Sequence, residues 1–288
     1  MHFNTTEIII DAFEERLRKV YGSMYTNLEP SYPGIISYVA RMSLELIANS
    51  DASFHDLSHT INVTLVGQDI LKGKHLRDGG VSPQDWLHFT ISLLCHDIGY
   101  VRGICKHDSD GRYVINAEQE TISLEPGATD AALTPHHVER GTLFIQERFA
   151  NNPNIDVEIV CSNIEHTKFP VPGANERNVG PVYPALLRAA DLIGQLADPN
   201  YMRRITMLFT EFQETGTNVT LGYKTAADLR AAYPTFFWTM VKPYLGDSLL
   251  YLRMTQQGQQ WIANLYAHIF AEEHVLPSLG PERAVNVM

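Results

Sequence analysis

The sequence predicts an all-α protein in which a single helical domain, residues 1–288, carries one small β-hairpin insertion. Apolar residues recur at helical spacing along most of the chain, whereas alternation with period two is confined to about residues 106–133. The hydrophobic fraction of 44% and the charged fraction of 19% are those of an ordinary globular protein, and 288 residues can bury a large core.

Charge and cysteine content argue against several classes of protein. A net charge of −11 disfavours nucleic acid as the main partner, because a phosphate backbone attracts basic surfaces. The three cysteines are widely spaced and form no CxxC pair, which is typical of a reducing compartment. The N-terminus lacks a signal-peptide pattern, and no apolar run is long enough to span a membrane. We therefore expect a cytoplasmic protein without membrane association.

The first two predicted helices are packing elements. Residues 5–21 repeat with helical period and carry mixed charge, and a second helix is expected over about residues 35–49. In the first helix, the shared apolar face is expected to contain Ile8, Ile9, Phe13 and Leu17.

A third helix is expected to open within the segment Phe54–His59. His55 and His59 are four residues apart, so on a helix they share one face. Val63 and Val66 continue near that face, which directs His59 toward the interior. The alternative is that both histidines are ordinary polar residues of a first helical turn.

The most informative stretch ends the next helix. An apolar run from Trp86 ends in His96 and Asp97, followed by the glycine stop Gly99. A neutral imidazole and a carboxylate are costly to bury side by side, and a divalent metal compensates them by taking nitrogen and oxygen ligands directly. The alternative is a helix end where the histidine meets the helix dipole and the aspartate begins a turn.

Two short segments after this stretch alternate with period two. Residues 112–116 and 120–124 are predicted to form a β-hairpin inside an insertion of about residues 106–133. A lone hairpin is marginal in water, so it should pack on the helical body or on another subunit, which leaves a homodimer open. A lid over the His-Asp pair and a plain surface insertion are equal alternatives.

A helix with two adjacent histidines follows the insertion. Thr134 and Pro135 are typical of a helix start, and the helix is expected to continue to about residue 150. The helical wheel places His137 beside the buried stripe, on the side of Gly141, whereas His136 lies farther round. His137 is therefore preferred as a metal ligand.

The next predicted helix, residues 155–168, carries one more histidine. Ile159, Val160 and Ile164 are expected to face the interior, and His166 lies near the C-terminal end. A histidine at this position is either a ligand or a partner of the helix dipole.

An aspartate lies inside the last candidate helix of the site. After a Pro/Gly-rich loop over residues 170–184, Asp191 is surrounded by apolar and small residues. A carboxylate in such surroundings has to be neutral, ion-paired or metal-bound. From about residue 200 to residue 288 we expect an aromatic-rich helical extension that forms core or dimer contacts.

The order of these residues resembles the HD-domain superfamily of metal-dependent phosphohydrolases. The resemblance covers about residues 50–200 and rests on His59, His96, Asp97, His137, His166 and Asp191. It implies an HD-domain helical bundle that holds one or two divalent metal ions, such as Mg, Mn, Fe or Zn. The implied ligands of the first metal are His59, His96, Asp97 and Asp191. Those of the second are His137 and His166, with Asp97 bridging the two ions.

The segment Phe54–His59 is also similar to the opening of the catalytic domain of cyclic-nucleotide phosphodiesterases. That similarity implies that His55 is a general acid, which protonates the leaving oxygen. Many HD proteins place a lysine shortly after the His-Asp pair, whereas this chain has Ile98–Arg102 there. Arg102 and Lys168 are therefore candidates to bind the substrate phosphate.

The resemblance implies a metal-dependent phosphohydrolase in which metal-activated water attacks a phosphodiester or phosphomonoester of a small, nucleotide-like substrate. Asp97, which would fix the metal spacing, and His55, which would donate a proton, are the candidate catalytic residues. Two other functions stay open. One is a di-iron HD-type oxygenase with the same cage of histidines and aspartates, and the other is a non-catalytic HD module that binds a ligand.

Overall fold

The computed structural model describes residues 4–109, 111–169 and 182–274, and this part of the chain is mainly helical, which confirms the predicted all-α class. Its α-helices are α1 (Thr5–Tyr25), α2 (Tyr32–Ala48), α3 (Leu57–Asp78), α4 (Pro83–Cys95), α5 (His137–Phe149), α6 (Val157–Glu165), α7 (Val182–Leu196), α8 (Tyr201–Thr215), α9 (Thr217–Leu221), α10 (Ala226–Phe236), α11 (Gly246–Leu252) and α12 (Gln256–Glu273). The short elements are the 3₁₀ turns η1 (Ile98–Tyr100), η2 (Asp130–His136) and η4 (Lys242–Tyr244), the π-helical turn η3 (Phe237–Val241), and the strands β1 (Arg112–Val114) and β2 (Thr121–Ser123).

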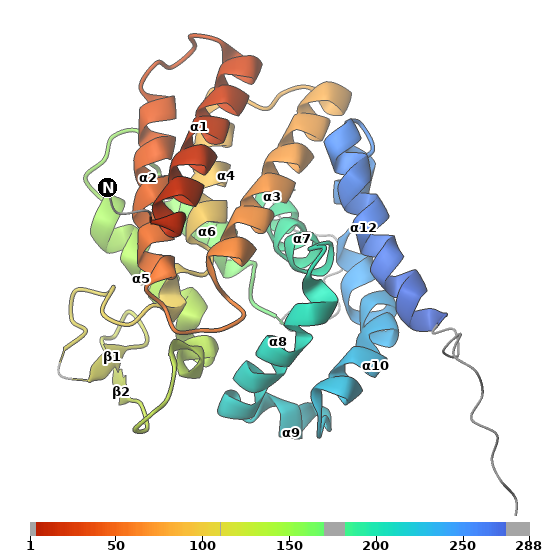
Figure 1. Cartoon of the computed structure of the whole chain (residues 1–288). Coiled ribbons are helices and arrows are strands. Elements are labelled where there is room, and N and C mark those ends of the chain that lie inside the picture. Colours follow the sequence, from red (N-terminus) through yellow and green to blue (C-terminus); the bar gives the residue numbers. More distant parts are fainter. Residues whose placement is uncertain (1–3, 110, 170–181, 275–288) are drawn as a thin grey trace, which may run out of the picture.

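Helix α3 is the central element of the fold, because α4, α7, α11 and α12 all pack against it (Figure 1). The Asp56 side chain caps its first turn by accepting a hydrogen bond from the backbone N–H of His59 at 3.0 Å. Val63, Val66 and Ile70 are fully buried along the helix. One face of α3 therefore lies in the interior, and His59, one turn before Val63, is buried on that face.

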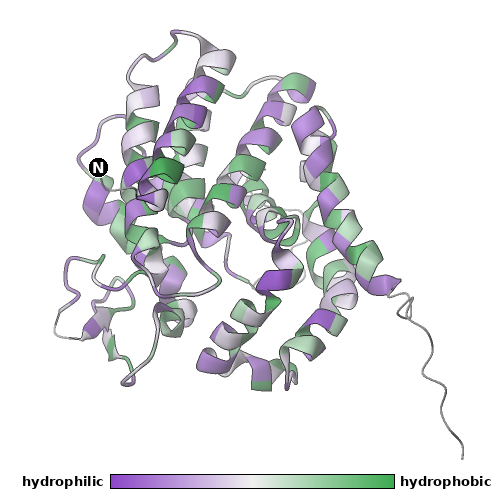
Figure 2. Ribbon diagram, in the orientation of Figure 1, coloured by the Kyte–Doolittle hydropathy of each residue, from purple (hydrophilic) through white to green (hydrophobic). Residues whose placement is uncertain are grey.

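The outer helices have two distinct faces. Figure 2 shows hydrophilic and hydrophobic residues on different sides of these helices, as expected for elements that cover a core. Among the described residues, no helix combines the length and the apolar content that a bilayer span requires.

Helices α3 and α7 approach each other so closely that their contact requires a glycine. A Cβ atom on Gly194 of α7 would lie 2.7 Å from Cα of Val63, a distance at which backbone atoms have to move. Asp191 precedes Gly194 by three residues and His59 precedes Val63 by four, so each shares a helix face with one side of this contact. The close approach therefore brings Asp191 toward His59.

The predicted apolar face of the first helix was partly wrong. Ile8 and Ile9 are 46% and 41% exposed, whereas Ile10 is 1% exposed. The buried stripe is Ile10, Phe13, Leu17, Tyr21 and Tyr25, because the helix continues four residues beyond the predicted end and this longer stripe sets its rotation. The second helix begins at Tyr32 and not near residue 35, with a proline in its first turn.

Two later helices are shorter than predicted. The residues before His137 form the 3₁₀ turn η2, so α5 begins with His137 itself. Helix α6 buries Val160 and Ile164 as predicted, but Ile159 is 41% exposed, because it lies on the outer side of this short helix.

Most of the predicted loop 170–184 lies outside the described residues, and α7 begins at Val182 within the range predicted for this loop.

The predicted hairpin is confirmed as a short antiparallel pair in which Tyr113 faces Ile122 across the strands. It is fixed to the helical body by Arg140 of α5, which is fully buried. This guanidinium donates to the carbonyl of Val114 in β1 and forms an ion pair with Asp108 at 2.9 Å. The hairpin therefore packs on its own helical body, the first of the two arrangements expected for it.

Candidate metal centre

Four side chains from three parts of the chain meet in the interior. We call His59, His96, Asp97 and Asp191 the His/Asp cluster. Asp97 Oδ2 lies 3.1 Å from Nε2 of both histidines. Asp191 Oδ1 lies 3.4 Å from His59 Nε2 and 3.6 Å from His96 Nε2, and the two imidazole nitrogens are 3.3 Å apart. The donor atoms thus surround one point.

This spacing fits a divalent metal ion. Donors held about 2.1 Å from one metal stand about 3.0–3.4 Å apart when the bond angles are about 90–109°. His59, His96 and Asp191 together meet the geometric requirement for a metal site within the described residues. Asp97 Oδ2 adds a fourth donor atom, an oxygen that is buried and accepts no hydrogen bond of good geometry among the described residues. A buried carboxylate oxygen without a partner is costly, and a bound cation would satisfy it.

The tautomer of His96 also suits a ligand. Its Nδ1 lies 2.9 Å from the carbonyl oxygen of Leu93, and because a carbonyl only accepts hydrogen bonds, Nδ1 carries the proton. Nε2 is then free to offer its lone pair toward the cluster. A histidine ligand oriented in this way by a backbone carbonyl is a common arrangement around metals.

The electrostatics of the cluster favour a bound cation. Burial alone would lower the pKa of His59, but Asp191 and Asp97 outweigh it and raise that pKa to about 9. The same carboxylates raise the pKa of His96 against the effect of burial. In return the two histidines outweigh burial at Asp191 and lower its pKa to about 2. Without a metal, protons on the histidines balance the two carboxylates.

His137 lies at the edge of the cluster, whereas no described contact joins His136 to it. His137 Nε2 is 4.0 Å from the other oxygen of Asp97, Oδ1. Its Nδ1 donates to the carbonyl of Thr134 at 2.6 Å, and burial lowers its pKa, so the neutral ring presents Nε2 to Asp97. Oδ2 of Asp97 therefore faces His59 and His96, and Oδ1 faces His137, which is the arrangement that the predicted bridging role requires.

The structure does not bring His166 to this position. Its Nδ1 donates to the carbonyl of Ser162 at 3.0 Å, and no described contact joins it to Asp97. The imidazole turns back on the last turn of α6, which is the alternative open for a histidine at a helix end.

His55 is close to the cluster for a different reason from the one predicted. His55 precedes α3, whose capping residue is Asp56. The prediction that His55 and His59 share one face of a helix was therefore wrong. Its ring nevertheless lies 5.5 Å from that of His59 between centroids. His55 Nδ1 is 2.6 Å from Oε2 of Glu211, a buried residue of α8 that also accepts from the backbone N–H of Phe54 at 2.7 Å.

Glu211 is a site residue that sequence reasoning missed. It holds His55 by Nδ1, so that Nε2 of His55 is the nitrogen left for chemistry. Helix α8 buries Ile205, Leu208 and Phe209, and Glu211 is the carboxylate buried with them at 3% exposure. A glutamate near the apolar residues of a helix was the available signal.

The two predicted phosphate-binding cations are paired with carboxylates elsewhere. Arg102 forms ion pairs with Asp51, at 2.6 Å, and with Asp130. Lys168 forms ion pairs with Glu139 at 2.7 Å and Glu165 at 3.1 Å. No contact of either cation with the His/Asp cluster is found among the described residues.

Arg188 differs from these two cations. It precedes Asp191 by one helical turn on α7, and its Nε donates to the carbonyl of His166 at 2.6 Å. Its guanidinium also lies 5.4 Å from the centre of the Tyr244 ring. Burial lowers its pKa, and no carboxylate of the described residues lies within salt-bridge distance of it.

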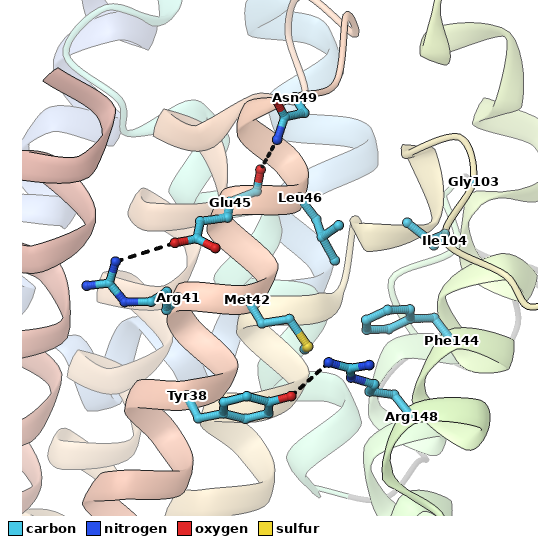
Figure 3. Close-up of a pocket in the computed structure, with 10 residues that line it drawn as sticks. All are labelled: Tyr38, Arg41, Met42, Glu45, Leu46, Asn49, Gly103, Ile104, Phe144 and Arg148. Atoms are coloured by element: carbon cyan, nitrogen blue, oxygen red, sulfur yellow. Dashed lines mark hydrogen bonds and ion pairs between the residues drawn. The ribbon is translucent and has the colours of Figure 1, made fainter. Parts of the chain in front are cut away.

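A separate hollow lies between α2 and α5. It has a volume of about 570 Å³ and is bordered by α2, by α5 and by residues 103–104 (Figure 3). Met42 and Phe144 contribute apolar surface, and Arg148 donates to the hydroxyl of Tyr38 at 2.8 Å. No residue of the His/Asp cluster lines this hollow, so it is not the entrance to the candidate metal centre.

The described part of the chain is thus a helical protein with a candidate metal centre. A model of the Npun_R2479-like family matches residues 3–275, so the chain belongs to that family. No curated protein matches the chain.

Proposed function

We propose that this protein is an HD-type, metal-dependent phosphohydrolase that acts on a phosphate ester of a small molecule. The observation that supports this most is the convergence of His59, His96 and Asp191 around the buried Oδ2 atom of Asp97. The order of these residues in the chain is the one on which the HD-domain resemblance rests.

Each residue of the site has a definite task in this proposal. His59, His96, Asp97 Oδ2 and Asp191 would hold the first divalent ion, and Asp97 Oδ1 and His137 are placed to bind a second. Such ions supply a hydroxide nucleophile at neutral pH and neutralise the charge on the phosphoryl group. Because His166 points away, the second position has fewer protein ligands than the first.

His55 is the proton donor of the proposal. The Nδ1–H group of His55 donates to Glu211, which holds the ring and leaves Nε2 as the nitrogen for proton transfer. A proton on Nε2 can pass to the departing ester oxygen as the P–O bond breaks. Before this transfer, the buried carboxylate of Glu211 stabilises the protonated ring. It stays ionised because His55 lowers its pKa against the effect of burial.

Arg188 replaces Arg102 and Lys168 as the candidate for an anionic group of the substrate. Its charge is desolvated and has no described carboxylate partner, whereas those of Arg102 and Lys168 are neutralised. A planar guanidinium suits a phosphate or carboxylate, which it can bind through two parallel hydrogen bonds.

The direct test is Mn²⁺-dependent hydrolysis of a chromogenic phosphodiester and a chromogenic phosphomonoester. We expect turnover that Asp97→Ala abolishes together with Mn²⁺ binding, since this variant removes both carboxylate oxygens from the centre. Asp247→Asn, an exposed change on α11, serves as the matched control and should behave as the wild type. Activity that survives in Asp97→Ala would contradict the proposal.

The same ligand types also suit iron, so the assay needs a second arm. Protein loaded with iron that consumes oxygen and releases no phosphate or alcohol from either ester would favour the di-iron oxygenase instead. Protein that takes up no divalent metal would favour the non-catalytic module.

A further inference from the structure

One tyrosine joins the two histidines that flank the His/Asp cluster. The ring of Tyr100 is stacked on that of His55, with centroids 4.5 Å apart and planes inclined by 13°. The same ring is also stacked on that of His137, with centroids 4.6 Å apart and planes inclined by 25°. Tyr100 itself is 3% exposed, so its ring is almost completely shielded from solvent.

The position of Tyr100 is fixed by the backbone around it. Tyr100 belongs to η1, and its N–H donates to the carbonyl of Asp97 at 3.1 Å, so it is tied directly to the cluster residue. A Cβ atom on Gly99 would lie 1.8 Å from the carbonyl oxygen of His137, which shows that η1 is pressed against the start of α5. The backbone of Tyr100 is therefore fixed relative to Asp97 and to the start of α5.

Among the described residues, the side chain of each of these two histidines makes one hydrogen bond, which leaves one rotation of the ring free. His55 is held through Nδ1 by Glu211, and His137 is held through Nδ1 by the carbonyl of Thr134. A ring held by one hydrogen bond can still rotate about that bond. A flat surface against the ring face removes the rotation, because stacking restricts the plane of the ring.

We propose that Tyr100 is a positioning residue that fixes the ring planes of His55 and His137, so that both Nε2 atoms are presented to the candidate metal centre together. This inference rests on the proposed function, in which His55 donates a proton and His137 binds a metal. The ring face, and not the hydroxyl, carries the effect. The hydroxyl stays protonated near neutral pH because burial and the charge of Asp97 raise its pKa.

The first experiment measures the rings in metal-free protein. The carbon-bound protons of both imidazoles are assigned by NMR from His55→Gln and His137→Gln, and are then compared in Tyr100→Phe and Tyr100→Leu. A stacked aromatic ring shifts these protons upfield. We expect the shifts to be kept in Tyr100→Phe and lost for both histidines in Tyr100→Leu. Shifts that do not change in Tyr100→Leu would overturn the proposal.

The second experiment measures Mn²⁺-dependent turnover of the phosphodiester in the same variants. Loss of orientation should lower kcat by up to about 100-fold in Tyr100→Leu with KM little changed, and Tyr100→Phe should retain wild-type kcat. Equal losses in Tyr100→Phe and Tyr100→Leu would assign the effect to the hydroxyl and overturn the proposal. Tyr32→Leu, which removes a buried tyrosine from the aromatic contacts of α1 and α2, controls for loss of core volume.

If Tyr100→Leu does not fold, Tyr100→Met replaces it as a non-aromatic side chain that fills irregular space. If the wild type shows no turnover on any ester, the proposed phosphohydrolase is contradicted, while the NMR comparison in metal-free protein still decides whether Tyr100 orients the two histidines.

Discussion

At the scale of single residues, Asp97 is the most informative group in the protein. One of its oxygens faces His59 and His96 at 3.1 Å, and the other faces His137 at 4.0 Å. Its pKa is held well below the ordinary value because the two nearer histidines outweigh the effect of burial. A carboxylate that stays ionised in the interior and faces histidines on both sides is suited to bridge two cations.

The division of labour between His55 and the cluster can be tested by His55→Gln. This variant should keep Mn²⁺ affinity, because His55 supplies no ligand to the cluster, and should lower kcat by about 10²–10⁴-fold, the usual contribution of a general acid. Calorimetry gives the affinity and steady-state kinetics give kcat. His107→Gln, at an exposed position, is the control. Unchanged kcat would reduce His55 to a structural role.

The protonation of His59 predicts how metal binding depends on pH. In metal-free protein its pKa is raised from 6.5 to about 9, so the stability that its charged form provides is complete below pH 6.5 and is lost as the pH rises through 9. A metal ion replaces these protons, so its affinity rises over the same interval. The increase in Tm caused by saturating Mn²⁺ should therefore be larger at pH 8 than at pH 6.5.

Thermal unfolding with and without Mn²⁺ at the two pH values measures this effect. His59→Gln should show little increase in Tm at either pH, which makes it the control for binding elsewhere. An equal increase in Tm at both pH values in the wild type would contradict the assignment of His59 as a ligand that must lose its proton.

At the scale of helices, the site depends on close approach of backbones. Helix α7 reaches α3 only because Gly194 has no side chain to contact Val63, and η1 reaches α5 only because Gly99 has none to contact the carbonyl of His137. Glycine inside a helix is otherwise unfavourable, by about 1 kcal/mol relative to alanine. Its presence at Gly194 therefore indicates a packing requirement.

Gly194→Ala should destabilise the protein by about 1–3 kcal/mol, the usual cost of overpacking a core, and should also weaken Mn²⁺ binding by moving Asp191. Gly22→Ala is the matched control, because Gly22 also lies inside a helix, α1, but a Cβ there meets nothing within 4 Å. It should be neutral or stabilising by up to about 1 kcal/mol. Urea unfolding compares the two variants, and similar stabilities would contradict the packing argument.

At the scale of the whole molecule, the features that could be predicted from the sequence are those that local residue patterns determine. The all-α class, the hairpin, and the positions of His59, His96, Asp97, His137 and Asp191 on or beside helices all follow from periodicity and from turn residues. These five residues also come together in the structure, because α7 packs against α3 and α4, and α5 packs against η1, which directly follows His96 and Asp97.

The parts that sequence patterns missed are decided by long-range contacts. Glu211 meets His55 from a helix more than 150 positions away, and no local pattern pairs them. Arg102 forms ion pairs with Asp51 and Asp130, which lie far from it in the sequence. His166 turns onto its own helix because a carbonyl one turn earlier is available to its Nδ1. Such choices depend on tertiary packing and not on the spacing of residue types.

The most direct test of the central claim is a crystal structure of the protein soaked in Mn²⁺, with anomalous scattering used to locate the ion. We expect a peak about 2.1 Å from Nε2 of His59 and His96 and from carboxylate oxygens of Asp97 and Asp191. A weaker second peak is expected between Asp97 and His137. An anomalous map without a peak at the His/Asp cluster, at a Mn²⁺ concentration that supports turnover, would contradict the account.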